Sequence, residues 1–87
     1  MHITILNATM TRDEESGYVG HVRFTVEGHK KAYELTLQSA KGRDWGYSLS
    51  FLDESGPDEE IDAVDEYLDE DDDAFDRMVE AARAQLR

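Results

Sequence analysis

The chain of 87 residues contains no cysteine and only one proline. Without cysteine it has neither disulfides nor a thiolate for catalysis or metal binding, which fits a reducing compartment. No stretch approaches the roughly 20 apolar residues that a transmembrane helix needs. The first ten residues also lack the basic start and apolar core of a signal peptide. We therefore expect a cytoplasmic protein that does not bind membranes.

Basic residues are scarce in one part of the chain only. The net charge is −12. Residues 1–52 contain six acidic and six basic residues, whereas residues 53–87 contain fifteen acidic and three basic residues. The whole charge imbalance therefore lies in residues 53–87. Such a surface repels phosphates, so direct binding to nucleic acid or to an anionic membrane is disfavoured.

The length predicts a single domain over residues 1–87. A domain of this size buries only about 60% of the surface that its unfolded chain exposes, so its stability is marginal. Hydrophobic residues make up 39% of the sequence. This is enough for a thin two-layer core, and too little for a core with a deep substrate pocket.

Residues 1–52 predict an antiparallel sheet, because apolar and polar residues alternate with a period of two. After Ile3 and Ile5 the apolar positions shift to Leu6, Ala8 and Met10, which predicts a bulge or burial on both faces. We expect a polar turn at residues 12–17 and a tight reversal at residues 28–29. The aromatic side chains near the end of this part belong to the apolar face and not to a base-stacking platform. The predicted strands are His2–Met10, Tyr18–Glu27, Lys30–Gln38 and Trp45–Leu52.

The period changes to that of a helix after Pro57. Residues 58–86 as one helix would be about 43 Å long, more than twice the length of a typical strand of about 17–20 Å. We therefore predict two helices, with Ser55 or Gly56 capping the first and Asp72 or Asp73 capping the second. The fold class is α+β: a four-stranded, mainly antiparallel sheet (ββββ) followed by two acidic C-terminal helices packed on one face. Each predicted helix carries apolar residues at helical spacing, which form an apolar stripe. The stripe of the first helix is Ile61, Val64 and Leu68, and that of the second is Phe75, Met78, Val79, Ala82 and Leu86.

The acidic residues are spaced in a way that costs helix stability. Rows of acids recur every four residues, and each such like-charge pair destabilises a helix by about 0.2–0.5 kcal/mol. Asp69 and Glu70 stand where the first helix should end, and there they oppose the helix dipole. Solubility does not require this arrangement, which indicates a partner that supplies positive charge. The first row of acids is Asp58, Asp62, Glu66 and Glu70, and the second row is Asp65, Asp69 and Asp73.

The density of these acids supports a more specific hypothesis. Residues 58–80 contain thirteen acids in about 34 Å of helical path, whereas duplex DNA presents one charge per about 1.7 Å. In size, charge layout and mixed α/β make-up the chain resembles small phage-type acidic DNA-mimic inhibitors of the anti-CRISPR and anti-restriction class. The resemblance involves no shared motif and implies a non-enzymatic inhibitor of a basic, nucleic-acid-binding protein. We assign partner binding to Glu59, Asp62, Glu66, Asp69, Glu70, Asp72, Asp73 and Asp76.

Other interpretations of the sequence stay open. The partner can instead be a basic toxin or nuclease, with this chain as its immunity protein. The chain can also be a plain regulatory or structural domain whose acidity serves solubility, with weak Ca²⁺ binding. Asp69, Asp71, Asp73 and Glu80 match four positions of an EF-hand loop, but Ala74 replaces its required glycine. No arrangement of the three histidines matches a catalytic motif, so we predict no enzymatic activity, no metal site and no cofactor.

Overall fold

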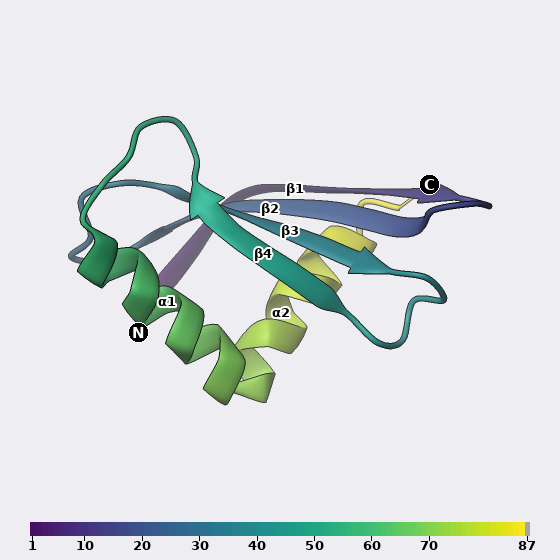
Figure 1. The fold of residues 1–87 in the computed structure, drawn as a ribbon. Helices are drawn as coiled ribbons and strands as arrows, with labels where there is room; N and C mark the ends of the chain where they lie inside the picture. Colours follow the sequence, from purple (N-terminus) through teal and green to yellow (C-terminus); the bar gives the residue numbers. More distant parts are fainter. Residues whose placement is uncertain (87) are drawn as a thin grey trace.

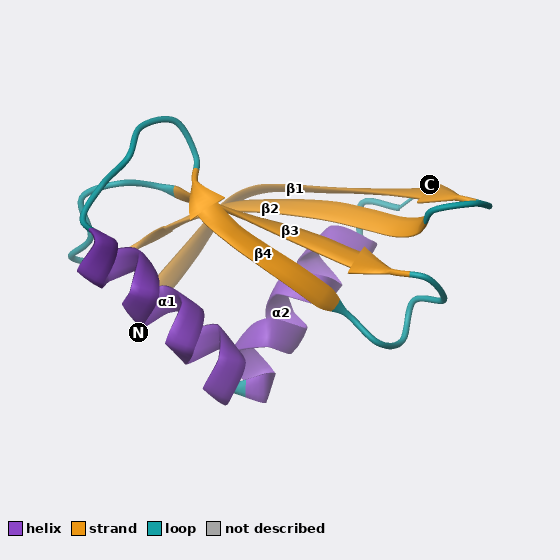
Figure 2. Ribbon diagram, in the orientation of Figure 1, coloured by secondary structure: helices purple, strands orange, loops and turns teal. Residues whose placement is uncertain are grey.

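The computed structural model describes residues 1–86, which form a sheet layer and a helical layer (Figure 1). The four strands are antiparallel and lie in the sheet in chain order, β1-β2-β3-β4. Both helices cover the same face of this sheet (Figure 2). The predicted α+β fold with two C-terminal helices is confirmed. The elements are β1 (Ile3–Asp13), β2 (Gly17–Val26), β3 (Tyr33–Ser39), β4 (Gly46–Phe51), α1 (Asp58–Glu70) and α2 (Asp72–Arg83).

The phase shift in the first strand is a β-bulge. The pairing of β1 with β2 shifts between Ile5 and Asn7, so that Leu6 is the extra residue. Beyond the bulge the even-numbered side chains face the helices, and Met10 is buried there. One inserted residue therefore keeps both halves of a long strand in contact with the same core.

Two strand boundaries differ from the sequence-based prediction by three residues, and the other six differ by one. β1 continues to Asp13 through residues that we assigned to a polar turn, and its Arg12 lies opposite Tyr18. The Arg12 guanidinium stands 5.6 Å from the centre of the Tyr18 ring, a contact that favours pairing without apolar alternation. β3 begins at Tyr33 rather than at Lys30.

The core lies between the helices and the inward face of the sheet. Leu35 is at its centre, opposite Val22 on one side and Leu49 on the other. The aromatic residues of β4 pack against this core, as predicted. The outward sheet face is polar, and it contains an ion pair of 3.0 Å between Arg23 and Glu34. The buried core residues are Met10, Val22, Phe24, Val26, Tyr33, Leu35, Leu37, Val64, Leu68, Ala74, Met78, Val79 and Ala82.

Two glycines allow the layers and turns to approach closely. Gly20 lies on β2 below α2, where an added Cβ would be 2.9 Å from the Met10 methyl carbon and 3.2 Å from the Ala82 Cβ. Gly17 has a φ of +78°, and a Cβ there would be 2.5 Å from the Ser39 carbonyl oxygen. A side chain at Gly17 would clash with the backbone of Ser39, whereas one at Gly20 would displace the end of the Met10 side chain.

The acidic segment is divided into two helices at Asp71. This residue is extended, and its carboxylate accepts a hydrogen bond of 3.1 Å from the Ala74 N–H. The prediction of two helices is therefore confirmed, but the cap precedes the two residues that we proposed. The first cap was also predicted wrongly: Pro57 is the N-cap residue and offers no side-chain hydrogen bond, while its carbonyl accepts from the Glu60 N–H. Neither α1 nor α2 is long and apolar enough to cross a membrane, and the same holds throughout residues 1–86.

Candidate functional site

The acidic surface is built by two helices that bury one side each. On α1, Val64 and Leu68 are buried, and on α2 Met78 and Val79 are buried. Acidic residues occupy many of the exposed positions between these buried residues. α1 packs against β4, whereas α2 packs against β1 and β2, so the helices diverge from their junction at Asp71 (Figure 1).

All eight predicted partner-binding residues are exposed to solvent. The ion pairs of residues 1–86 join Arg23 to Glu34 and Lys31 to Glu54, so neither involves any of the eight. Their carboxylates also accept no hydrogen bond from the described chain. α1 carries Glu59, Asp62, Glu66, Asp69 and Glu70, and α2 carries Asp72, Asp73 and Asp76.

The structure brings only some of these residues together. Glu70, Asp72 and Asp73 line one shallow, open depression at the helix junction, together with Asp71 and Tyr67. Glu59 stands at the other end of α1, about 17 Å away along the helix axis. The eight carboxylates, which we call the acidic strip, are therefore distributed along both helices and are densest at the junction.

The predicted rows of like charge survive on one helix only. Asp58, Asp62, Glu66 and Glu70 recur at every fourth position of one continuous helix, as predicted. The second predicted row is broken, because the junction separates Asp73 from the acids of α1. No basic residue occurs in the last turn of α1, so its terminal carbonyl groups meet negative charge.

Three further acids of the segment have structural hydrogen bonds. Glu60 accepts from the Lys30 backbone N–H at 3.0 Å and ties the start of α1 to the loop before β3. Asp65 accepts from the Tyr47 hydroxyl at 2.8 Å and joins α1 to β4. Together with the cap at Asp71, these bonds fix the orientation of both helices. The sequence contained no signal that separated Glu60 and Asp65 from the other acids, whereas Asp71 falls on a position that the apolar stripe would bury.

The hydrogen bond between α1 and β4 perturbs the tyrosine that donates it. Burial and the adjacent Asp65 carboxylate raise the pKa of Tyr47 to about 12. Asp69 adds to this effect through its negative charge. Each charge disfavours the tyrosinate anion, so the hydroxyl stays protonated and continues to donate.

The EF-hand match does not form a loop. Asp69 lies in α1, Asp71 is a helix cap, and Asp73 and Glu80 both lie within α2. An EF-hand requires twelve loop residues that fold around one ion. Within residues 1–86 no three histidine or acidic side chains are placed to hold a metal ion.

Two histidines of the sheet region lie within hydrogen-bonding distance of a hydroxyl group. The His29 Nδ1 lies 2.8 Å from the Tyr33 hydroxyl, and the His21 Nδ1 lies 3.3 Å from the Thr36 hydroxyl. Both contacts support the sheet and its turn.

Comparison of the chain with protein-family models, with curated proteins and with solved structures gave no match.

Proposed function

We propose that this protein is a non-enzymatic inhibitor that imitates DNA. Its acidic helices occupy the basic nucleic-acid-binding surface of a partner protein, as anti-CRISPR and anti-restriction inhibitors do. The observation that carries the proposal is the exposure of eight unpaired carboxylates on two helices that are anchored to one sheet.

The internal energetics of the acidic surface support a binding role. Like charges stand one turn apart along α1, and the helix ends in negative charge without a compensating base. Both features lower the stability of the helix. Lysine or arginine side chains from a partner would remove this repulsion, so the helix would be more stable in the complex than in the free protein. Complementary charge also accelerates association.

The anchoring of the helices adds to this argument. Glu60, Asp65 and Asp71 are used for docking and capping, while the remaining acids keep their carboxylates in solvent. The charges therefore stand on helices that are already ordered, and binding costs this chain less conformational entropy than it would cost an unfolded acidic tail.

Affinity capture tests the proposal. The protein is immobilised on a resin and incubated with a cell lysate at low salt. Bound proteins are then released by washes of increasing salt. We expect a basic protein that is retained at low salt and displaced by duplex DNA. Retention should be lost when Asp69, Glu70, Asp72 and Asp73 are replaced by lysine.

The matched control carries the same charge change elsewhere. Four exposed acids in the turns of the sheet region are replaced by lysine and should leave retention largely intact: Glu14, Glu15, Glu27 and Asp44. Equal loss in both variants would mean that net charge alone matters, and the proposed surface would be wrong. Capture of a nuclease that this protein silences would identify an immunity protein instead. If no basic protein were captured, the chain would be an acidic domain without the proposed inhibitor role.

A further inference from the structure

The outer edge of β1 offers free backbone hydrogen-bonding groups. Within residues 1–86, β1 pairs with β2 and with no other strand. The Glu27 N–H donates to the His2 carbonyl at 3.0 Å, so the backbone of His2 points toward β2. Because these directions alternate along a strand, the N–H and C=O groups of Ile3 and Ile5 point to the free edge.

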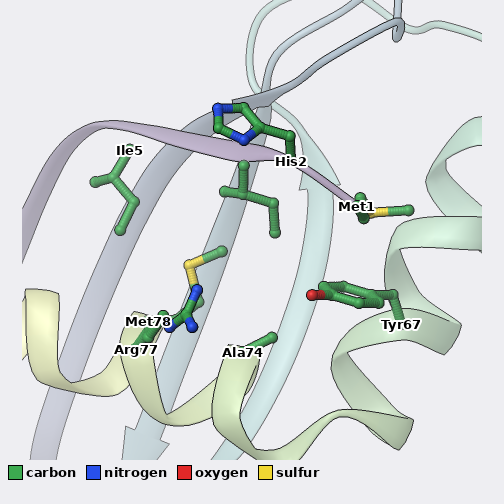
Figure 3. Close-up of a pocket in the computed structure, with 8 residues that line it drawn as sticks. Met1, His2, Ile5, Tyr67, Ala74, Arg77 and Met78 are labelled. Atoms are coloured by element: carbon green, nitrogen blue, oxygen red, sulfur yellow. The ribbon is translucent and has the colours of Figure 1, made fainter.

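The same stretch of β1 borders a pocket of about 170 Å³. Ile5 of β1 lies on one side, and Tyr67 of α1 and Met78 of α2 lie on the opposite side (Figure 3). Ile3 of β1 also lines the pocket. Two of the exposed large apolar side chains of the described chain line this pocket: Met1 is 50% and Ile5 39% exposed. Leu6, next to Ile5 at the bulge of β1, is 55% exposed. Exposed apolar residues beside an unpaired strand edge are a feature that free proteins usually avoid.

A positive charge lines this pocket although the surrounding helices are acidic. Arg77 is the only basic residue between positions 53 and 82, and its side chain contributes to the pocket wall (Figure 3). Asp73 and Glu80 lie one turn away on α2, yet neither forms an ion pair with Arg77 within residues 1–86. The pocket is lined by no aspartate or glutamate.

We propose that the edge of β1 binds an extended peptide segment that carries one apolar anchor and one carboxylate. The segment adds a fifth strand at Ile3 and Ile5, places its anchor side chain in the pocket, and pairs its carboxylate with Arg77. The volume favours this occupant, because small-molecule sites measure about 300–1,000 Å³, whereas this pocket holds about one side chain. The strongly negative helices disfavour a segment with many acids. The inference involves residues outside the acidic strip and does not depend on the proposed function.

An array of random heptapeptides with free C-termini tests the proposal, with the full chain as the probe. Retained peptides should share an apolar residue and a carboxylate. Arg77→Gln should weaken their binding about tenfold, whereas Arg83→Gln, on the same helix outside the pocket, should not. Ile5→Pro should abolish binding and leave the fold intact, since proline is tolerated where the N–H faces away from the sheet.

Hydrogen exchange of the wild-type chain provides a second measurement that needs no variant. A retained peptide should slow the exchange of the Ile3 and Ile5 amides, and the Tyr33 amide inside the sheet should change little. An array without retained peptides would overturn the proposal. So would equal binding by the two arginine variants, or unchanged exchange at β1. Light scattering that shows a dimer joined through β1 would identify a second copy as the occupant and would also overturn it.

Discussion

Replacing Glu66 by glutamine should stabilise the protein. Glu66 is exposed and lies midway along α1, with Asp62 four residues before it and Glu70 four residues after it. Each of these like-charge pairs costs about 0.2–0.5 kcal/mol, so removing both should raise the free energy of unfolding by about 0.4–1 kcal/mol. Glutamine and glutamate have similar helix propensities, so the gain reflects charge alone.

Urea unfolding at low ionic strength measures this gain as a higher midpoint with an unchanged slope. The same comparison in 1 M salt should show little difference, because the screening length falls to about 3 Å. Glu60→Gln is the matched control with the opposite sign. Glu60 has no acid four residues away, lies in the favourable first turn, and accepts the Lys30 N–H, so its neutralisation should lower stability.

Electrostatic destabilisation of α1 would be ruled out if Glu66→Gln left the free energy of unfolding unchanged or lowered it at low salt. A gain that persisted in 1 M salt would also contradict it, because the effect could not then be electrostatic. Either result would remove the energetic argument for a partner that neutralises α1.

Three further predictions concern the scaffold. Leu35→Ala should lower the free energy of unfolding by about 2–5 kcal/mol, because Leu35 is fully buried at the centre of the core; urea unfolding measures this, and a change below 1 kcal/mol would contradict the described packing. Asp71→Ala should cost about 0.5–2 kcal/mol through the lost cap of α2, whereas Asp72→Ala, which removes only a first-turn charge, should cost less; equal effects would argue against the cap. Tyr47 has a pKa of about 12 in the folded protein and 10 when unfolded, so the folded state holds its proton more tightly. This contribution to stability is complete below pH 10 and is lost as the pH rises toward 12. When unfolding is followed across that range, the loss should be smaller in Tyr47→Phe, in which Tyr33, whose pKa burial also raises, still contributes.

The strand pattern could be predicted because one face of the sheet is buried. Period-two alternation placed Val22, Phe24, Leu35 and Leu37 correctly, and the shift after Ile5 indicated the bulge. The polar end of the first hairpin escaped prediction, because pairing there depends on partners across the turn and not on apolar alternation.

The acidic segment shows a different limit. The excessive length of a single helix predicted a break, but several adjacent aspartates can each cap a helix equally well in the sequence. Only the packed structure selects Asp71, since its position lets both apolar stripes reach the sheet. The docking roles of Glu60 and Asp65 depend on Lys30 and Tyr47, which are 30 and 18 positions away in the chain. Such contacts leave no trace in local spacing.

Imitation of DNA is tested by equilibrium competition between this protein and a short DNA duplex for the basic partner obtained by capture. If the acidic helices occupy the nucleic-acid-binding surface, the two ligands should exclude each other, and the affinity of the partner for this protein should fall steeply with salt. A ternary complex that contains the partner, the duplex and this protein, with an affinity that salt hardly changes, would contradict the account.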